Sequence, residues 1–287
     1  MTAPSPTRFR LGDRTVARAG YGAMQLTGPG VFGPPPDRDA AIALLRTAVD
    51  LGVDHIDTAQ YYGPDVVNEL IRDALHPYPN DLAIVSKVAA RRGTRGEILP
   101  YDKPAELRAG IEDNLRSLRV DRLAAVNLRM PDDTALPDAR FDDQLAAMIQ
   151  AREDGLIEGV GLSNVSLAQL EHALTITDIV TVQNSYGLAD RHSQDVLELT
   201  TERGISFAPY LPLGWPGRIR LATLGNPAVV AIAERLGVTP AQVALAWLLG
   251  AAPNVLLIAG TSSIEHLREN LAAADIELTP EDRRALD

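Results

Sequence analysis

The feature that most constrains the fold of this chain is a regular alternation of short apolar runs with amphipathic helical segments. Each apolar run is rich in Val, Ile, Leu and Ala, and each following segment places apolar side chains at helical spacing. The predicted strands span 19–24, 53–57, 82–87, 121–128, 157–162, 179–183, 205–209 and 255–259. The predicted helices span 39–52, 65–75, 104–118, 139–154, 166–174, 193–203, 227–236, 239–250 and 263–274.

The predicted strands are continuous apolar runs rather than alternating apolar and polar residues, which is typical of a parallel sheet covered on its outer face. Eight strand-to-helix steps predict an α/β fold, a (β/α)8 TIM barrel, with an N-terminal β-hairpin at 8–17 and extra helices. We expect a single domain over 1–287. The alternative is a doubly wound open sheet, but the glycine fingerprint that would follow its first strand is missing.

Composition argues against several classes of function. The formal net charge of −11, without a large Lys/Arg cluster, disfavours binding to nucleic acid or to an anionic membrane. There is no Cys, and no third ligand stands near Asp132 and Asp133, so no metal site is predicted. The sequence contains no apolar run of the roughly 20 residues that a membrane span needs, and residues 1–10 lack the features of a secretory signal. We expect a cytoplasmic protein and favour a monomer.

Three titratable side chains stand where predicted strands end or just beyond. A parallel barrel gathers these ends on one face, so Asp57, Tyr62 and Lys87 are expected to meet there. A nearby ammonium lowers the pKa of a tyrosine hydroxyl, and a carboxylate holds that ammonium in place. The chain has only one other lysine, at 103, and otherwise uses arginine. These residues suggest a proton donor for a developing alkoxide, and a buried salt bridge beside a tyrosine is the alternative.

Several motifs together resemble those of the aldo-keto reductase family. They are DTAQYYG at 57–63, GLSN at 161–164, QNSY at 183–186, YLPLG at 210–214 and GTSSIEHLRENLAA at 260–273. They occur in the family's order, one per barrel strand, and the likeness runs nearly from end to end. GYGAMQLTGPGVFGPPP at 20–36 and VNLRM at 126–130 resemble the bacterial branch that contains pyridoxal reductases.

The resemblance implies roles for the residues that match. Tyr62 is expected to be the general acid, with Lys87 lowering its pKa and Asp57 holding Lys87. Tyr210 is expected to stack on the nicotinamide of NADPH. The full set that the resemblance assigns to the cofactor is Gly22, Met24, Asp57, Ser163, Asn164, Gln183, Tyr210, Leu211, Leu213, Gly260, Thr261, Ser262, Ser263, His266, Arg268 and Asn270.

Within that set the expected contacts differ. Ser163, Asn164 and Gln183 are expected to hydrogen-bond the nicotinamide carboxamide. The residues from Gly260 to Ser263 are expected to hold the adenosine phosphate, with Asn270 near the adenine and Arg268 assisting.

The chain also departs from the family pattern. Arg129 stands where a fourth catalytic residue, a histidine, is usual, and it cannot transfer a proton near neutral pH. His266 stands where many members place an arginine against the adenosine 2′-phosphate, so NADPH is expected with NADH less favoured. The sequence has no long C-terminal loop beyond Asp282 to narrow the substrate pocket. An open mouth is expected, bounded by 25–38, 88–103, 129–138 and 212–226.

The activity implied by the resemblance is NADPH-dependent reduction of an aldehyde or ketone to an alcohol, with pyridoxal, reduced to pyridoxine, as one candidate substrate. The alternatives are a tailoring ketoreductase of a secondary metabolite and a cofactor-binding regulatory protein with weak turnover.

Other side chains are assigned structural places. His55 points to the same side of its strand as Asp57, so a part in the chemistry is one alternative, but it is expected inside the barrel with its hydrogen bonds satisfied. Tyr61 is expected in a packing or rim role, and Trp247 in the core. Trp215 is expected to line the substrate pocket. The surface is expected to carry His76, His172 and His192.

Overall fold

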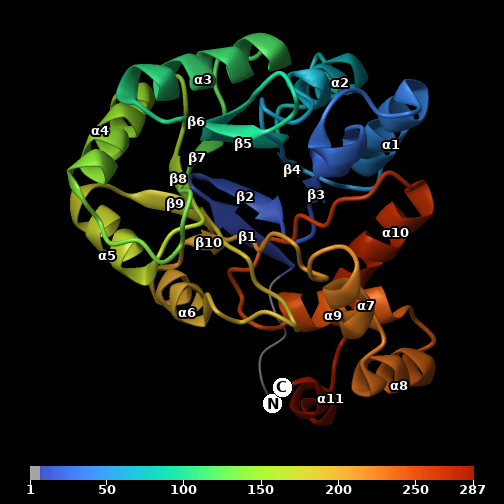
Figure 1. The fold of residues 1–287 in the computed structure, drawn as a ribbon. Helices are drawn as coiled ribbons and strands as arrows, with labels where there is room; N and C mark the ends of the chain where they lie inside the picture. The colour runs from blue at the N-terminus through green and yellow to red at the C-terminus, as the bar shows by residue number, and fades with distance from the viewer. Residues whose placement is uncertain (1–6) are drawn as a thin grey trace.

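The computed structural model describes residues 7–287 and arranges parallel strands in a curled sheet with helices outside it (Figure 1). Residues 1–6, the first part of the segment that lacks the features of a secretory signal, lie outside the described residues. Along the sheet the strands follow chain order: β3 (Tyr21–Gly22), β4 (His55–Asp57), β5 (Ala83–Arg92), β7 (Ala125–Arg129), β8 (Val160–Ser163), β9 (Ile179–Gln183) and β10 (Ser206–Phe207). Each pairs with the next in parallel, as predicted.

The sheet is closed between β10 and β3 by the segment 254–257. Parallel bridges join Phe207 to Val255 and Ala19 to Leu257. This segment is most of the last predicted strand, but it meets each neighbour through a single bridge instead of a continuous ladder. The result is the predicted (β/α)8 barrel.

Arg18 fastens the closing segment from inside the protein. Its side chain is buried, and its guanidinium donates to the carbonyl oxygens of Val255 at 3.0 Å and Ala252 at 2.7 Å, and also to that of Leu249. A buried guanidinium needs such acceptors, since an unpaired buried charge is costly. These bonds therefore stabilise the point where the two ends of the sheet meet.

The predicted N-terminal hairpin closes one end of the barrel. Strands β1 (Arg8–Leu11) and β2 (Arg14–Ala17) pair antiparallel across the middle of the ring (Figure 1). The hairpin is fixed to residues that precede barrel strands: Arg8 pairs with Asp54 at 2.6 Å, and Arg14 with Glu158 at 2.7 Å. It therefore lies at the amino ends of the strands, which leaves the carboxyl ends open.

Helices surround the barrel, and most of them begin and end where the sequence provides caps. The helices are α1 (Arg38–Asp50), α2 (Val66–Leu75), α3 (Pro104–Leu118), α4 (Ala139–Glu153), α5 (Leu167–Ile176), α6 (Gln194–Arg203), α7 (Arg218–Leu224), α8 (Pro227–Leu236), α9 (Pro240–Leu249), α10 (Ile264–Ala272) and α11 (Pro280–Leu286). Ser166 and Thr239 form capping boxes at the starts of α5 and α9. Gly204 and Gly237, both left-handed, end α6 and α8.

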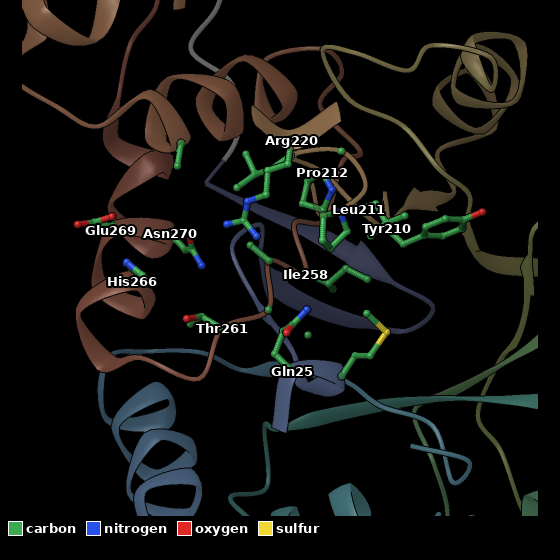
Figure 2. Close-up of a pocket in the computed structure, with 18 of the residues that line it drawn as sticks. Gln25, Tyr210, Leu211, Pro212, Arg220, Ile258, Thr261, His266, Glu269 and Asn270 are labelled. Atoms are coloured by element: carbon green, nitrogen blue, oxygen red, sulfur yellow. The ribbon is translucent and has the colours of Figure 1, made fainter. Parts of the chain in front are cut away.

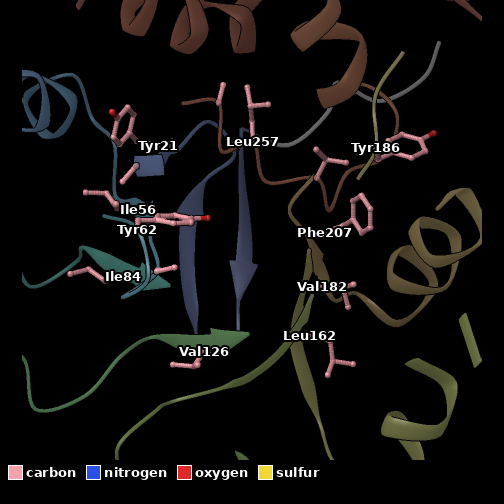
Figure 3. Packing of buried hydrophobic residues seen from close by; sticks show 14 of the residues in the cluster. Tyr21, Ile56, Tyr62, Ile84, Val126, Leu162, Val182, Tyr186, Phe207 and Leu257 are labelled. Atoms are coloured by element: carbon pink, nitrogen blue, oxygen red, sulfur yellow. The ribbon is translucent and has the colours of Figure 1, made fainter. Parts of the chain in front are cut away.

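The hydrophobic core has two parts. The larger part lies between the outer face of the sheet and the helices, where Ile56, Val126 and Leu162 are fully buried (Figure 3). The smaller part fills the barrel interior with short side chains, including Ala83 and Ala125, above hairpin residues such as Leu11 and Val16. Small interior residues leave room for the hairpin, so the lower barrel is packed and the upper end is free to form a site.

Several predicted loops contain regular structure. β5 continues to Arg92 and turns back to pair antiparallel with β6 (Ile98–Tyr101), so 88–103 is mainly a hairpin. Its residues do not show strand-like alternation, and mutual pairing at the rim gives them this structure. α7 lies inside the predicted loop 212–226, short 3₁₀ turns occupy parts of 25–38, and α11 follows the last predicted helix. Such short elements are set by packing rather than by periodicity.

Among the helices of residues 7–287, none is long and apolar enough by itself to cross a membrane. The α8 and α9 helices reach that length and composition only as a pair bent by 98°.

Candidate active site

A buried ion pair joins Asp57, the last residue of β4, to Lys87, which lies where β5 makes its last parallel pairs in the barrel. Lys87 Nζ lies 2.5 Å from Asp57 Oδ1, and it also donates to the carbonyl oxygen of Thr58 at 3.0 Å. The second carboxylate oxygen of Asp57 accepts from Gln183 Nε2 at 2.8 Å. Asp57 and Lys87 are each only 5% exposed. Both oxygens of the carboxylate are therefore engaged, which holds the ammonium in one position.

Tyr62 lies directly beside this pair. Lys87 Nζ is 5.2 Å from the centre of its ring. Figure 3 shows the ring packed next to Ile56, with the hydroxyl pointing away from that wall toward the middle of the barrel. Burial raises the pKa of the Tyr62 hydroxyl above its usual range, and the charge of Asp57 raises it further, while Arg129 lowers it. Tyr62 is thus protonated at neutral pH, which is the form a general acid requires.

A network of buried amides and hydroxyls supports the strand that delivers Asp57. Thr58 donates its hydroxyl to Asn68 Oδ1 at 2.8 Å, and Asn68 in turn donates to Asn114 Oδ1 at 2.9 Å. Ser86, the neighbour of Lys87, donates to the same oxygen of Asn114 at 2.6 Å. Because α2 and α3 carry the two asparagines, these helices fix the ends of β4 and β5 relative to each other.

Arg129 ends β7 as predicted and is half-buried. Within residues 7–287 its guanidinium has neither a hydrogen bond nor an ion pair. Its charge nevertheless acts on the phenols around it, because it lowers the pKa of Tyr62 and of Tyr210 against the larger effect of burial. A free guanidinium at this place is available to a ligand oxygen.

A cavity of about 350 Å³ runs from these residues to α10 (Figure 2). The residues predicted for the cofactor that line it are Gly22, Met24, Asp57, Gln183, Tyr210, Leu211, Leu213, Gly260, Thr261, His266 and Asn270. Tyr62 lines its inner end. Those that do not line it are Ser163, Asn164, Ser262, Ser263 and Arg268. The cavity thus joins residues from the first and last parts of the chain.

Two glycines let the backbone form the floor of this cavity. A Cβ at Gly22 would lie 2.3 Å from the carbonyl oxygen of Ile258, and a Cβ at Gly260 would lie 2.6 Å from the carbonyl oxygen of Gly22. Tyr21 fixes the same loop, because its hydroxyl donates to the carbonyl oxygen of Thr261 at 2.6 Å. Since backbone atoms cannot move aside as side chains do, neither glycine tolerates a larger residue.

Asn164 has a structural place beside the cavity. Its Oδ1 accepts the Tyr210 hydroxyl at 2.8 Å, and its Nδ2 donates to the carbonyl oxygen of Met130 at 3.0 Å. It therefore orients Tyr210 and joins the loops after β7 and β8. Leu211, the next residue after Tyr210, has φ of 52°, which is rare for a side chain of this size. Such strain is typical of backbone held for a ligand.

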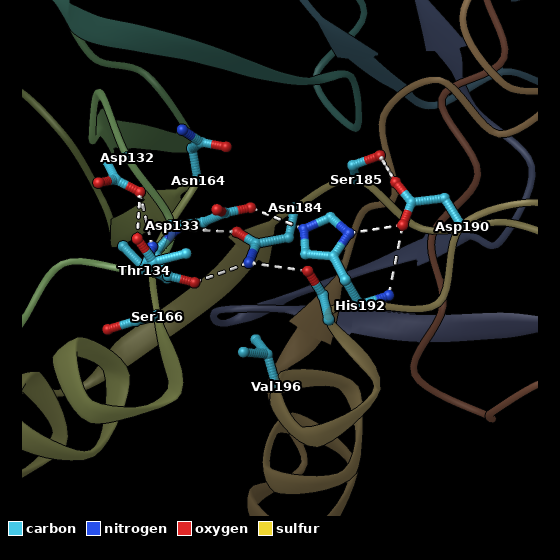
Figure 4. Close-up of polar contacts among 12 residues, drawn as sticks. Asp132, Asp133, Thr134, Asn164, Ser166, Asn184, Ser185, Asp190, His192 and Val196 are labelled. Carbon is cyan, nitrogen blue, oxygen red and sulfur yellow. Dashed lines mark hydrogen bonds and ion pairs between the residues drawn. The ribbon is translucent and has the colours of Figure 1, made fainter.

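A polar cluster on the same face ties two loops together (Figure 4). His192 Nδ1 lies 2.6 Å from Asp190 Oδ1, and His192 Nε2 lies 2.7 Å from Asp133 Oδ2. Ser185 donates to the other oxygen of Asp190 at 2.7 Å. The hydrogen bond to Asp190, aided by Asp133, raises the pKa of His192 although burial opposes it. The sequence pattern predicts a surface histidine here, and the structure places it, still partly exposed, as a link between the loops after β7 and β9.

Sequence reasoning missed several residues of the cavity. They are Gln25, Pro212, Gly214, Pro216, Arg220, Leu224, Thr239, Pro240, Ala241, Ile258, Ala259 and Glu269. Most belong to loops or helix starts that carry no motif of their own. Four of them do lie within motifs quoted above, namely Gln25 in 20–36, Pro212 and Gly214 in 210–214, and Glu269 in 260–273.

Other predictions have mixed outcomes. His55 lies inside the barrel as expected, but among the described residues its ring nitrogens make no hydrogen bond within 3.5 Å, and Nδ1 lies 3.8 Å from Asp54 Oδ1. Trp247 is buried as predicted, and it stacks on Tyr186. Tyr61 is 4% exposed and packs edge-on against Tyr62, so its role is packing. Trp215 is 64% exposed and does not line the cavity.

No group of three or more His, Cys, Asp or Glu side chains gathers as a metal site within residues 7–287.

Comparisons with known proteins agree on one family. A family model described as the aldo/keto reductase family matches residues 18–287. The chain is 47% identical to pyridoxine 4-dehydrogenase of Escherichia coli over 285 residues, which cover 99% of this chain and 98% of that protein. An aldo/keto reductase from Klebsiella pneumoniae, solved with NADP and acetate, has a TM-score of 0.81 and 28% identity, and the match covers 98% of this chain and 94% of that one. A thermostable aldo-keto reductase solved with the inhibitor epalrestat has a TM-score of 0.81 and 32% identity, with 98% of both chains covered.

Proposed function

Because this chain belongs to the aldo/keto reductase family, we propose that it reduces an aldehyde or ketone to an alcohol with NADPH. The observation that carries the proposal is the buried Asp57–Lys87 pair beside Tyr62 at the inner end of the cavity. A protein that only bound a dinucleotide would gain nothing from burying these charges, since the desolvation of a buried pair offsets much of its attraction. Tyr62 beside this pair can instead donate a proton to the carbonyl oxygen during reduction.

The residues that line the cavity have the chemistry that a dinucleotide needs. Apolar residues such as Leu211 and Leu213 line it together with polar side chains such as those of Gln183, Thr261 and Asn270. The close backbone approach at Gly22 and Gly260 forms a floor that an extended ligand can lie against. The Klebsiella pneumoniae relative of the same fold was solved with NADP. NADPH in this cavity would supply the hydride, with its nicotinamide near Tyr210.

The residues of this chain then supply and position the proton. Tyr62 donates its hydroxyl proton to the carbonyl oxygen as negative charge develops there, and Lys87 stabilises the phenolate left behind. Asp57 keeps the ammonium at that place, and Gln183 keeps Asp57 in its orientation through the 2.8 Å hydrogen bond. Burial by the surrounding wall keeps Tyr62 neutral until a substrate oxygen is present.

Arg129 supports a finer proposal about the substrate. Its unpaired guanidinium stands on the face where the carbonyl is reduced, and it binds best to an oxygen that carries negative charge. Pyridoxal has a phenolic oxygen next to its aldehyde. The Escherichia coli relative at 47% identity is a pyridoxine 4-dehydrogenase. We therefore place pyridoxal first among the candidate substrates, with a tailoring reaction on a ketone of a secondary metabolite as the alternative.

The proposal is tested by following the loss of NADPH absorbance with a panel of aldehydes and ketones that includes pyridoxal and 4-nitrobenzaldehyde. Turnover of pyridoxal with formation of pyridoxine supports the finer proposal. Turnover of neutral aldehydes alone supports carbonyl reduction but not pyridoxal. Tight NADPH binding without turnover of any carbonyl would instead favour a cofactor-binding regulatory protein. We further propose a single-domain, cytoplasmic monomer, which gel filtration and cell fractionation test.

A further inference from the structure

Arg220 enters the cavity from an element that carries no sequence motif. It lies on α7, a short helix between Gly217 and Gly225, and it is among the residues that line the cavity. Figure 2 shows the side chain extending from α7 toward the side where Asn270 and His266 of α10 lie. The cavity therefore has a cation at the end opposite to Tyr62.

This guanidinium is unpaired in an otherwise acidic protein. The chain has 38 Asp and Glu against 27 Lys and Arg, and many of its arginines form ion pairs, as Arg14 and Arg235 do. Arg220 has no hydrogen bond or ion pair from its side chain in residues 7–287, and it is exposed to the cavity. An arginine that is free of the abundant carboxylates and directed into a cavity is available to an anionic ligand.

The other groups at this end favour an anion with help from Arg220. His266 lies here, and the first turn of α9 at Thr239 to Ala241 contributes the positive end of a ten-residue helix. Glu269 also lines this end, and its carboxylate repels an anion. An imidazole carries no fixed charge, whereas the guanidinium of Arg220 does, so Arg220 decides whether a phosphate is held against that carboxylate.

The cavity has one end at the proton donor and the other at α10. When NADPH lies with its nicotinamide near Tyr62, its adenosine half reaches α10. The only anionic group that distinguishes NADPH from NADH is the 2′-phosphate on that adenosine. We propose that Arg220 binds this phosphate and is the residue that makes the protein select NADPH over NADH. The inference rests on the proposed function. It assigns the selection of NADPH to a cation on α7 instead of to a residue on α10.

The position of Arg220 is fixed well enough for this role. α7 has one buried side chain, that of Thr223, and its hydroxyl donates within the helix to the carbonyl oxygen of Ile219 at 3.0 Å. Leu224, one residue further, faces the same cavity. Arg218 lies on the same helix but does not line the cavity. It provides a matched control with the same charge and similar exposure.

The test is a measurement of dissociation constants for NADPH and NADH by quenching of tryptophan fluorescence, on wild type, Arg220→Met and Arg218→Met. Loss of one charge-assisted contact is expected to weaken NADPH binding by Arg220→Met about ten- to hundredfold. NADH binding should change by about twofold or less, because NADH lacks the phosphate that makes the contact. Arg218→Met should match wild type with both dinucleotides. Competition by 2′-AMP should fall in Arg220→Met, and competition by 5′-AMP should not.

Rescue gives a second, independent readout. In the Arg220→Met background, His266→Arg returns a cation to the same end of the cavity and should restore preference for NADPH. Equal weakening of NADPH and NADH by Arg220→Met, or no weakening of NADPH, would overturn this inference while leaving carbonyl reduction intact. A wild-type protein that binds neither dinucleotide would overturn the proposed function and this inference with it. Thermal melting of each variant confirms that the fold is retained.

Discussion

The ammonium of Lys87 lies 2.5 Å from Asp57 Oδ1, and each of the two residues is only 5% exposed. Removing one member of such a buried pair leaves an uncompensated charge, which costs on the order of 3–5 kcal/mol of folding free energy. The pair is therefore a structural element as well as a catalytic one. Variants that keep the charge but change the shape of the charged group separate the structural role from the catalytic role.

Lys87→Arg keeps the positive charge but replaces a compact ammonium with a planar guanidinium. The buried space between Asp57 and Thr58 accommodates one nitrogen, so the larger group is expected to displace its acceptors. We expect kcat/KM for carbonyl reduction to fall at least about tenfold. The matched control is Lys103→Arg, which changes the only other lysine, at an exposed position. Near wild-type activity of Lys87→Arg would show that a point charge alone is sufficient.

Tyr62→Phe removes the proposed proton donor and little else, since the ring keeps its packing against Tyr61. The hydroxyl acts in the transition state, so kcat should fall far more than NADPH binding weakens. Steady-state kinetics and fluorescence titration measure the two quantities. Reduction that persists at a tenth of the wild-type rate or more would remove Tyr62 from the role of general acid. Tyr61→Phe, one residue earlier, is the control that should retain activity.

Arg129→Met tests the finer proposal about the substrate. Loss of one charge-assisted hydrogen bond corresponds to about 1.5–3 kcal/mol, so kcat/KM for pyridoxal should fall roughly ten- to hundredfold more than for an uncharged aromatic aldehyde of similar size. Equal losses on both substrates would instead make Arg129 part of general carbonyl activation. No loss on either would mean that its guanidinium does not reach the substrate.

Arg129→His restores the residue that the resemblance to the family leads one to expect at the end of this strand. Imidazole lacks the fixed charge of a guanidinium near neutral pH, so the preference of the variant should shift toward neutral aldehydes. The ratio of kcat/KM for 4-nitrobenzaldehyde to that for pyridoxal measures the shift. A ratio unchanged from wild type would contradict a role for the charge of Arg129 in substrate choice.

The contacts of His192 predict a pH-dependent contribution to stability. Its pKa is raised by the hydrogen bond to Asp190 and by Asp133, so protonated His192 stabilises the folded state. That contribution is complete below the unfolded pKa of about 6.5 and is lost as the pH rises through the higher folded value. The difference in Tm between wild type and His192→Gln should therefore be largest near about pH 6 and shrink toward about pH 9. A difference that grows with pH would contradict this assignment. The effect should be modest, because the side chain is 46% exposed.

The sequence predicted the parts of the site that the barrel topology itself determines. Asp57 and Arg129 end their strands, and Lys87 lies one residue before the last parallel pair of β5 with β7, although β5 itself continues to Arg92. A parallel barrel necessarily brings these positions together on one face. The hydrogen bond from Gln183 to Asp57 joins residues 126 positions apart, yet it follows from the same topology. Residues at the carboxyl ends of strands can thus be predicted from sequence, because the barrel topology places all of these ends on one face.

The site residues that the sequence did not predict depend on the paths of loops, and no periodic pattern of apolar residues indicates the path of a loop. Arg220 reaches the cavity only because α7 folds back over it, and 212–226 shows no helical pattern that a motif would mark. The 3.8 Å distance between His55 Nδ1 and Asp54 Oδ1 was missed for another reason. Whether a buried nitrogen finds a partner depends on distances of a few tenths of an ångström, and a residue pattern carries no such information.

The closing segment at 254–257, which forms the seam between β10 and β3, also determines the order in which the barrel forms. Arg18 and Val255, which meet across it, are 237 positions apart. While the chain is being synthesised, every pairing from β3 to β10 can form, but both outer strands keep unpaired backbone groups until the seam residues emerge. The floor of the cavity, where Gly22 meets Ile258, crosses the same seam. The binding cavity is therefore the last part of the barrel to form. A nascent chain that binds a ligand there no longer has the two unpaired edge strands.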